Sequence, residues 1–305
     1  MSVQEVTMHG LEAVRIWRHD QAAMSEEKKK LYFHKHFGSS PLDLADMWYD
    51  LVSTDIPGAA LTDREKTLWG FKRFMMAHYY IWSYTRNAEM LATAFMMNER
   101  YCRGRHLWDW IGKIAALKEK KIKWPDNLSS NDPDLFLISI DGTDLKTYEP
   151  KHPTMPIDKG MASNKFGNKA AWKYEVALLV HEPKVVWISG PHRGGKSDLT
   201  IWREGLKLKL AQLPGSMASV DLGYRTSEQD EVDLLAWPNS LDAWDSRDYK
   251  SRIRCRQETF FGRIKKFRIL SETFRHTKEK HKDAFEAVCV TVQYQMDNGS
   301  PIYHV

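Results

Sequence analysis

The sequence predicts an α/β protein in which an all-helical N-terminal region precedes a mixed β-sheet flanked by helices. Three observations lead to this prediction. Up to about residue 125 the apolar residues recur at helical spacing. Residues 124–134 (WPDNLSSNDPD) are rich in Pro, Asn, Asp and Ser, which is typical of a boundary between domains. Beyond that stretch, short apolar runs of strand length alternate with amphipathic segments.

Four segments of the N-terminal region have the apolar spacing of helices: 42–52, 65–82, 86–95 and 100–120. The last two are separated by the short turn MMNE, which suggests a helix-turn-helix unit over residues 86–118. Arg100, Arg103 and Arg105 lie early in its second helix, where such a unit carries its DNA contacts. The same pattern also fits an ordinary helical hairpin that packs on the core.

The elements beyond the boundary follow a defined order. We expect a strand at 135–141, a hairpin of strands at 173–180 and 184–189, an amphipathic helix at 197–213, strands at 216–221 and 231–238, a basic helix at 252–270 and an apolar helix at 282–298. Three early strands followed by alternating helices and strands are the order of the ribonuclease H-like fold. We therefore place a helical region at 1–128 and a ribonuclease H-like domain at 129–305.

Composition narrows the class of protein. The chain has 305 residues, of which 42% are hydrophobic and 28% charged, as in globular proteins. It shows neither a secretory signal nor a run of about 20 apolar residues, so we expect no membrane partner. Cys102, Cys255 and Cys289 lie far apart and form no CxxC pair, which argues against a structural zinc site and suits a reducing compartment.

Positive charge is concentrated near the C-terminus. The whole chain carries a net charge of +5, whereas residues 251–282 alone hold eleven Lys or Arg against three Glu. This block includes Arg254, Lys265 and Lys266, and it is a candidate surface for DNA phosphates. A solvated helix face would have the same composition.

Three acids occupy positions that suit metal-dependent phosphodiester chemistry. Asp141 ends the first predicted strand, Asp221 ends a later one, and Glu258 lies on the basic helix, with gaps of 80 and 37 residues between them. If the two strands are neighbours, Asp141 and Asp221 lie side by side, and a helix crossing that edge can supply Glu258. Mg²⁺ or Mn²⁺ prefers such oxygen ligands, and a pair of ions neutralises the attacking and leaving oxygens. Without cations, three neighbouring carboxylates should be partly protonated.

The motifs around these acids resemble those of PIF/Harbinger-type transposases, which have a DDE active site. The similar stretches are LFLISIDGTD, SNKFGNKAAWKYEVAL, VVWISGPHRGGKSDLTIWREGL, SVDLGYRT, RCRQETFFGRIKKFRIL and the C-terminal segment HKDAFEAVCVTVQYQMDNGSPIYHV, and upstream FHKHFGSSPLDLADMWYDL. Trp202 stands where the family usually has Phe. The family's three acids correspond to Asp141, Asp221 and Glu258. Asp198 matches a further family acid, and we expect it to orient a ligand or to cap the helix that begins there.

This resemblance implies a DNA endonuclease and strand transferase that acts at transposon ends on double-stranded DNA with Mg²⁺ or Mn²⁺, in two ions. It also implies a nuclear location, a homo-oligomer assembled on DNA and a Myb-like partner protein. The basic run KEKKIK (118–123) is compatible with nuclear import. An alternative with the same sequence features is a domesticated transposase that binds DNA but is catalytically silent.

A competing motif is GPHRGGKS (190–197), which fits the phosphate-binding loop of nucleotidases, with Lys196 and Ser197 as its key residues. Only 115 residues follow Gly190, where the loop begins, and Pro191 removes one backbone N–H from the phosphate cradle. We therefore expect a tight turn near the acids, where Arg193 and Lys196 can reach DNA phosphates.

Overall fold

The computed structural model describes residues 1–125, 136–148, 158–213, 217–240 and 242–303. The chain divides into two compact units. The first, the helical unit, comprises residues 1–121, 264–272 and 279–300, and the second, the sheet unit, comprises residues 122–263, 273–278 and 301–305. The predicted boundary between residues 128 and 129 lies outside the described residues.

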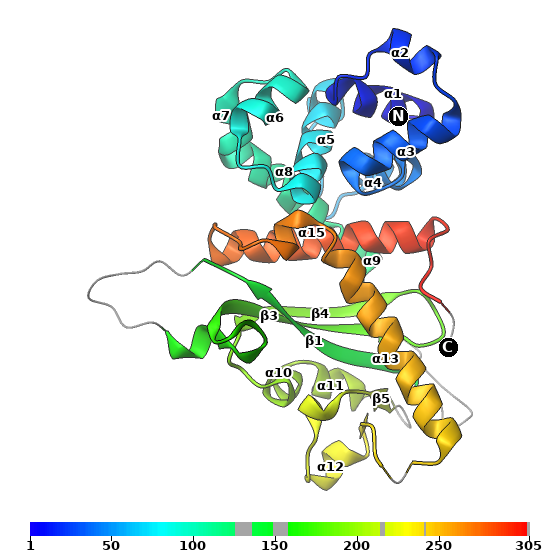
Figure 1. Ribbon diagram of the computed structural model, residues 1–305, viewed down its shortest axis with the longest axis vertical. Helices are drawn as coiled ribbons and strands as arrows, with labels where there is room; N and C mark the ends of the chain where they lie inside the picture. Colours follow the sequence, from blue (N-terminus) through cyan, green and yellow to red (C-terminus); the bar gives the residue numbers. More distant parts are fainter. Residues whose placement is uncertain (126–135, 149–157, 214–216, 241, 304–305) are drawn as a thin grey trace. The chain divides into compact units, whose positions relative to one another are not determined.

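The helical unit confirms the helical prediction for the N-terminal region (Figure 1). Its helices are α1 (Val3–Ala13), α2 (Arg18–Ala22), α3 (Glu26–Phe37), α4 (Pro41–Ser53), α5 (Leu68–Ser83), α6 (Ala88–Phe95), α7 (Glu99–Arg103), α8 (Arg105–Ala116), α9 (Lys118–Lys121), α14 (Arg268–Ser271) and α15 (Lys278–Asp297). Local sequence sets many helix starts. At α4, Ser40 and Asp43 form a reciprocal capping box, and Pro41 occupies the first turn, where no N–H is needed.

The predicted second helix of the helix-turn-helix, 100–120, is not continuous. Gly104 adopts an extended backbone (φ −103°, ψ −154°) and separates α7 from α8. Arg100 and Arg103 therefore lie on a helix of five residues, and Arg105 is the first residue of α8. The prediction missed this break because glycine lowers helix propensity without forbidding a helix.

The C-terminal helix α15 belongs mainly to the helical unit. Glu286 accepts a hydrogen bond from Lys118 Nζ at 2.7 Å, and Tyr294 donates to Asp50 Oδ2 at 2.6 Å. Thirteen of its side chains are buried, which explains why its sequence is apolar on more than one face. No described helix is long and apolar enough to cross a membrane.

The sheet unit is a mixed six-stranded sheet with helices (Figure 1). Its elements are β1 (Ile138–Lys146), η1 (Lys159–Met161), β2 (Ala162–Ser163), η2 (Asn164–Phe166), β3 (Lys169–Leu179), β4 (Val185–Arg193), α10 (Asp198–Glu204), α11 (Leu206–Leu210), β5 (Ala218–Ser219), η3 (Leu222–Tyr224), α12 (Gln229–Val232), β6 (Leu235–Ala236) and α13 (Trp244–Ile264). The strand order is β2-β3-β1-β5-β6, with β4 also paired to β3. The α/β prediction is thus confirmed at the level of a mixed sheet.

Helices cover both faces of the sheet. Ile138 and Ile140 pack with Trp202 and Leu206 on the face of α10 and α11. Val180 packs with Ile253 of α13 in a separate cluster. Side chains alternate between faces along a strand, so residues 139 and 141 of β1 point away from the α10–α11 face. Asp141 therefore lies on the side of the sheet that α13 covers.

Several predicted elements differ in extent. The helix predicted at 197–213 breaks at Gly205, where a Cβ would lie 3.2 Å from the Trp187 ring. The strand predicted at 231–238 shrinks to Leu235–Ala236, because residues 229–232 form the short helix α12. The helix predicted at 252–270 begins earlier, at Trp244, and ends at Ile264, before a separate turn of helix at 268–271.

Candidate active site

Asp141 lies within β1 and not at its end, contrary to the prediction. The apolar run stops at this residue, but β1 continues to Lys146 in antiparallel register with β3, and Asp141 is opposite Val176. Hydrogen bonding to β3 extends the strand through polar residues, which an apolar pattern does not reveal. The residues before and after Asp141 both pair with β3, and this pairing fixes the backbone that carries the carboxylate.

Asp221 reaches the same level from the neighbouring strand. β1 and β5 pair in parallel, with Ile138 opposite Ala218 and Ser139 opposite Ser219. Asp221 follows the end of β5 by two residues, and its charge acts on Asp141. Immediately after β5 the Asp221 carboxylate accepts a hydrogen bond from Gly223 N at 2.8 Å and begins the turn η3. The structure therefore brings these two predicted acids together.

The electrostatics of Asp141 reflect this proximity. The pKa of Asp141 is raised to about 7, first by burial and then by the charges of Asp221 and Asp198, whereas the N–H of Gly142 and the charge of Lys165 act in the opposite direction. The N–H of Gly142 donates to Asp141 Oδ1 at 2.7 Å. Near neutral pH the Asp141 carboxyl is therefore partly protonated, and a nearby cation would restore its charge.

Asp198 is a third acid beside this pair. A Cβ on Gly142 would lie 2.6 Å from Asp198 Oδ1, so the glycine that follows Asp141 makes room for this carboxylate. A Cβ on Gly223 would lie 2.9 Å from both Asp198 Oδ2 and Asp221 Oδ1. The two glycines thus allow three acids from separate elements to approach one another. Their positions directly after Asp141 and two residues after Asp221 are the sequence signal for this arrangement.

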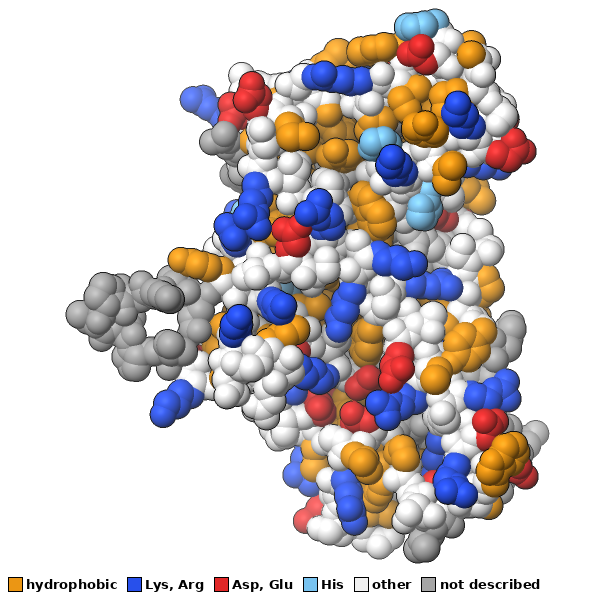
Figure 2. Space-filling view, viewed as in Figure 1, with side chains coloured by type: hydrophobic (Ala, Val, Ile, Leu, Met, Phe, Trp, Pro, Cys, Tyr) orange, Lys and Arg blue, Asp and Glu red, His pale blue; other side chains and the backbone are white. Residues whose placement is uncertain are grey.

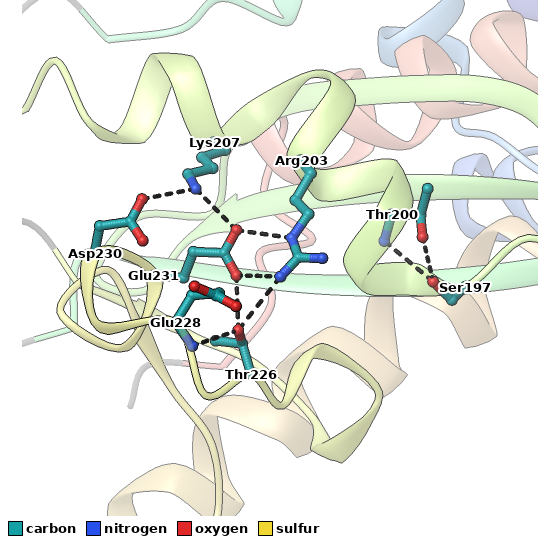
Figure 3. A network of polar contacts seen from close by, with 8 residues as sticks. All are labelled: Ser197, Thr200, Arg203, Lys207, Thr226, Glu228, Asp230 and Glu231. Carbon is teal, nitrogen blue, oxygen red and sulfur yellow. Dashed lines mark hydrogen bonds and ion pairs between the residues drawn. The ribbon is translucent and has the colours of Figure 1, made fainter.

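The proposed capping role of Asp198 is wrong in the structure. Ser197 caps α10, since its hydroxyl accepts from the N–H of Thr200 (Figure 3). Asp198 instead forms an ion pair with Lys173 Nζ at 3.0 Å. Ser and Asp at adjacent positions are both good N-caps, so sequence alone does not choose between them.

Lys173, which sequence reasoning missed, is the buried cation of this site. It lies on β3, is only 8% exposed, and its Nζ is 3.9 Å from Asp144 Oδ1. Asp144 also accepts a hydrogen bond from Ser163. Nearby, Lys165 donates to the carbonyl oxygen of Gly142 at 3.3 Å. A lysine in the interior of a largely buried strand was the available signal, because such a residue is rarely buried without a partner.

The turn of α13 that carries Glu258 lies beside the strand position of Asp141. Gln257 accepts from Ser139 Oγ at 2.8 Å and donates to the carbonyl of Val176 at 3.1 Å. Ser139 precedes Asp141 by two residues, and Val176 is the cross-strand partner of Asp141. The helix is thereby fixed at this level of β1.

Glu258 itself is exposed and accepts a hydrogen bond from Arg254 Nε at 3.0 Å. Within the described residues, its carboxylate has no hydrogen bond or ion pair with Asp141 or Asp221. In the same part of the chain, no three His, Cys, Asp or Glu side chains are grouped so that they could hold a metal ion. The structure places Asp141 where the charges of Asp221 and Asp198 act on it, and it places Glu258 on the adjacent helix.

Residues 226–231, which follow Asp221, form hydrogen bonds and ion pairs with α10 and α11 (Figure 3). Glu231 accepts from Arg203 at 2.7 and 2.6 Å, from Lys207 at 2.8 Å and from Thr226 at 2.7 Å. These hydrogen bonds, first that of Arg203, lower the pKa of Glu231 to about 2. The network holds the loop that begins at Asp221.

The basic residues predicted to contact DNA lie in different places. Arg100 is exposed on α7, Arg254 is exposed on α13, and Lys265 and Lys266 are exposed just beyond the end of α13. Figure 2 shows Lys and Arg side chains beside acidic ones on one face of the molecule. Their role in DNA binding stays a prediction.

The GPHRGGKS stretch does not form a phosphate-binding loop. Residues 190–193 continue β4, which pairs antiparallel with β3. The backbone N–H of Gly194 donates to Ala171 O, that of Gly195 to Gly160 O, and that of Lys196 to Arg193 O. A phosphate cradle needs such N–H groups free to face the ligand. Lys196 itself is paired with Glu204, so the nucleotidase alternative is not supported.

Comparisons with known proteins identify the family of the chain. The family model described as DDE superfamily endonuclease matches residues 140–293, just over half of the chain. This segment contains Asp141, Asp198, Asp221 and Glu258. A search of curated proteins and one of solved structures found no match. With the matched segment spanning all four acids, the chain belongs to the DDE superfamily endonucleases.

Proposed function

We propose that this protein is a divalent-metal-dependent DNA endonuclease and strand transferase of the PIF/Harbinger transposase type, built on a ribonuclease H-like sheet. The observation that carries the proposal is the parallel register of β1 and β5, which brings Asp141 level with Asp221. The family match to DDE superfamily endonucleases supports nuclease chemistry. The strand order β3-β1-β5-β6, with β4 beyond β3, supports the ribonuclease H-like assignment.

The donor set fits a divalent cation. Asp141 and Asp221 offer neighbouring oxygen ligands, and the pKa of Asp141 is raised by burial and by the charge of Asp221. Two bound Mg²⁺ or Mn²⁺ ions would neutralise charge on the attacking and leaving oxygens. Asp141 and Asp221 would hold these ions, and Glu258 would complete the set from α13. Lys173 forms an ion pair with Asp198 and would orient it beside them.

Other residues supply substrate contacts in this proposal. Arg254, Lys265 and Lys266 near the end of α13, and Arg100, Arg103 and Arg105 of α7 and α8, would bind the phosphate backbone of double-stranded DNA. A nuclear location, assembly as a homo-oligomer on DNA and a Myb-like partner protein follow from the same family resemblance.

A plasmid-nicking assay with Mg²⁺ or Mn²⁺ tests the proposal. We expect the wild type to nick DNA, EDTA to stop it, and Asp141→Ala to abolish it, while Asp245→Ala, an exposed acid on α13, retains activity. DNA binding measured by gel shift should persist in Asp141→Ala. A wild type that binds DNA without cutting it under either metal would contradict the proposal and favour the catalytically silent alternative.

A further inference from the structure

A pocket of about 440 Å³ in the helical unit plays no part in the nuclease site. It opens between the start of α5 and the segment from the end of α6 to α7. Leu68, Trp69 and Arg73 line one side, and Met96, Met97 and Tyr101 line the other. The whole pocket is built from residues 68–101, so it lies within one compact unit.

Arg73 is a buried cation in this pocket. The residue is only 7% exposed. Its guanidinium lies 3.2 Å from the Trp69 ring centroid and 5.4 Å from that of Tyr101, and its Nη1 donates to Trp69 O at 2.9 Å. Its Nε has no hydrogen-bond partner among the described residues, and none of their carboxylates forms an ion pair with it.

The charge of Arg73 is therefore incompletely compensated. Burial lowers the pKa of Arg73, and the charge of Arg64 lowers it further, whereas Tyr101 and Cys102 act in the opposite direction. Burial of an unpaired charge is unfavourable, and a contact with an aromatic ring offsets only part of this cost. An anionic group entering the pocket would supply the missing counter-charge. The pocket lining adds Lys72 and contains no Asp or Glu, so its charge is positive throughout.

The remaining lining is aliphatic and thioether surface. Met96 is 68% exposed and Leu68 is 42% exposed at the rim. Met96 caps α6 in a left-handed conformation (φ 50°), which ends the helix at this rim. Methionine side chains adapt their shape and commonly line surfaces that bind apolar segments of other proteins.

The aromatic rings do not favour a nucleotide as the ligand. Bases bind to proteins by stacking on aromatic faces. Here the Trp69 ring is approached by Arg73 and also by Arg64, at 4.6 Å from its centroid. The Tyr101 ring packs against His106 at 4.6 Å between centroids. Arginine side chains thus contact the Trp69 ring, and His106 contacts the Tyr101 ring, where a base would otherwise stack.

We propose that this pocket binds a segment of a partner protein that presents an Asp or Glu carboxylate to Arg73. A bulky apolar side chain of the same segment would pack on Leu68 and Met96. Such a segment would contact both the positive lining and the exposed apolar rim. Amphipathic helical peptides bind grooves of other proteins in this way. This inference is independent of whether the protein cuts DNA.

The test uses the full chain labelled with ¹³C-methyl methionine and a short amphipathic helical peptide that carries Leu, Phe and Glu on one face. We expect the Met96 and Met97 methyl signals to shift on titration. The same peptide with Gln in place of Glu should bind at least tenfold more weakly, because the charge-assisted bond to Arg73 is lost. Lys72→Glu should weaken binding to a similar extent.

Two variants control for folding and for general charge. Lys28→Glu makes the same charge change at an exposed position of α3 and should leave binding unchanged. Arg73→Met should lose the preference for Glu over Gln while its thermal midpoint stays near that of the wild type, since a buried unpaired cation is removed. Equal binding of the two peptides, no methyl shift at millimolar peptide, or shifts with oligo(dT) but not with the peptide would each overturn the proposal.

Discussion

Two buried carboxylates of the sheet unit, Glu231 and Asp141, have opposite surroundings. Glu231 receives hydrogen bonds from Arg203, Lys207 and Thr226, and its pKa falls to about 2. Burial and the neighbouring charge of Asp221 raise the pKa of Asp141 to about 7. The first arrangement lowers the energy of the folded state, whereas the second leaves like charges close together. Such strain typically marks a functional site, because the missing positive charge arrives with a ligand.

The largest expected effect is on catalysis. Asp221→Asn should reduce DNA cleavage by on the order of 10³-fold or more, because it removes a charged ligand oxygen while keeping the acceptor for Gly223 N. Its thermal midpoint should stay at or above that of the wild type, since the repulsion with Asp141 is relieved. Cleavage kinetics and thermal melts of the same preparations check both parts. A variant that melts well below the wild type would show that Asp221 stabilises the fold.

The next effect is on stability. Glu231→Gln should lower the free energy of unfolding by about 2 kcal/mol, because hydrogen bonds from charged donors to a nearly fully buried carboxylate are lost. Urea unfolding measures this change, and Glu228→Gln, an exposed neighbour in the same turn, should have little effect (Figure 3). If Glu231→Gln unfolds at the same urea concentration as the wild type, the hydrogen bonds to Glu231 do not stabilise the fold.

Stability should depend on pH in opposite directions at the two acids. The folded pKa of Glu231 lies below its ordinary value of 4.5, so its contribution is complete above that pH and is lost as the pH falls towards about 2. The folded pKa of Asp141 lies above its ordinary value of 3.8, so its cost is absent at lower pH and grows as the pH rises to about 7.

Thermal melts without metal across this range test the sign. At pH values above 7, Asp141→Asn should raise the thermal midpoint. Near pH 4 the substitution should leave the thermal midpoint unchanged. The penalty of Glu231→Gln should be full at pH 7 and shrink on acidification towards pH 2. If the two variants respond to pH in the same direction, the contrast drawn between the two acids is wrong.

The smallest effect concerns the exposed pair on α13. Arg254→Gln should change the free energy of unfolding by less than about 0.5 kcal/mol, because both side chains of the Arg254–Glu258 pair are more than half exposed to solvent. Urea unfolding again provides the measurement, with Glu231→Gln as the reference for a buried network. A loss as large as that of Glu231→Gln would mean that exposure is a poor guide to the strength of these ion pairs.

Much of the helical unit could be predicted from local sequence. Apolar spacing predicted α4, α5, α6 and α15, and capping residues such as Ser40 set their starts. Breaks at Gly104 and Gly205 were missed, because a single glycine permits a helix and only neighbouring groups such as the Trp187 ring decide whether it ends there.

The strands of the site were predicted less well. The apolar run ending at Asp141 suggested the end of a strand, but pairing with β3 extends β1 by five more residues. The run SMASVD suggested a full strand, whereas β5 is only two residues long. Strand length depends on partners that are distant in sequence, and a local pattern does not contain them.

The sequence by itself identified the candidate residues for the proposed chemistry: acids after apolar runs, glycines beside them and a basic helix bearing Glu258. Only the tertiary structure decided which of them meet. Parallel pairing of β1 with β5 aligned Asp141 with Asp221, and the space left by Gly142 and Gly223 admitted Asp198, which Lys173 holds. The physical reason is that electrostatic coupling depends on distance in space and on burial, and both arise only when strands far apart in the chain pair.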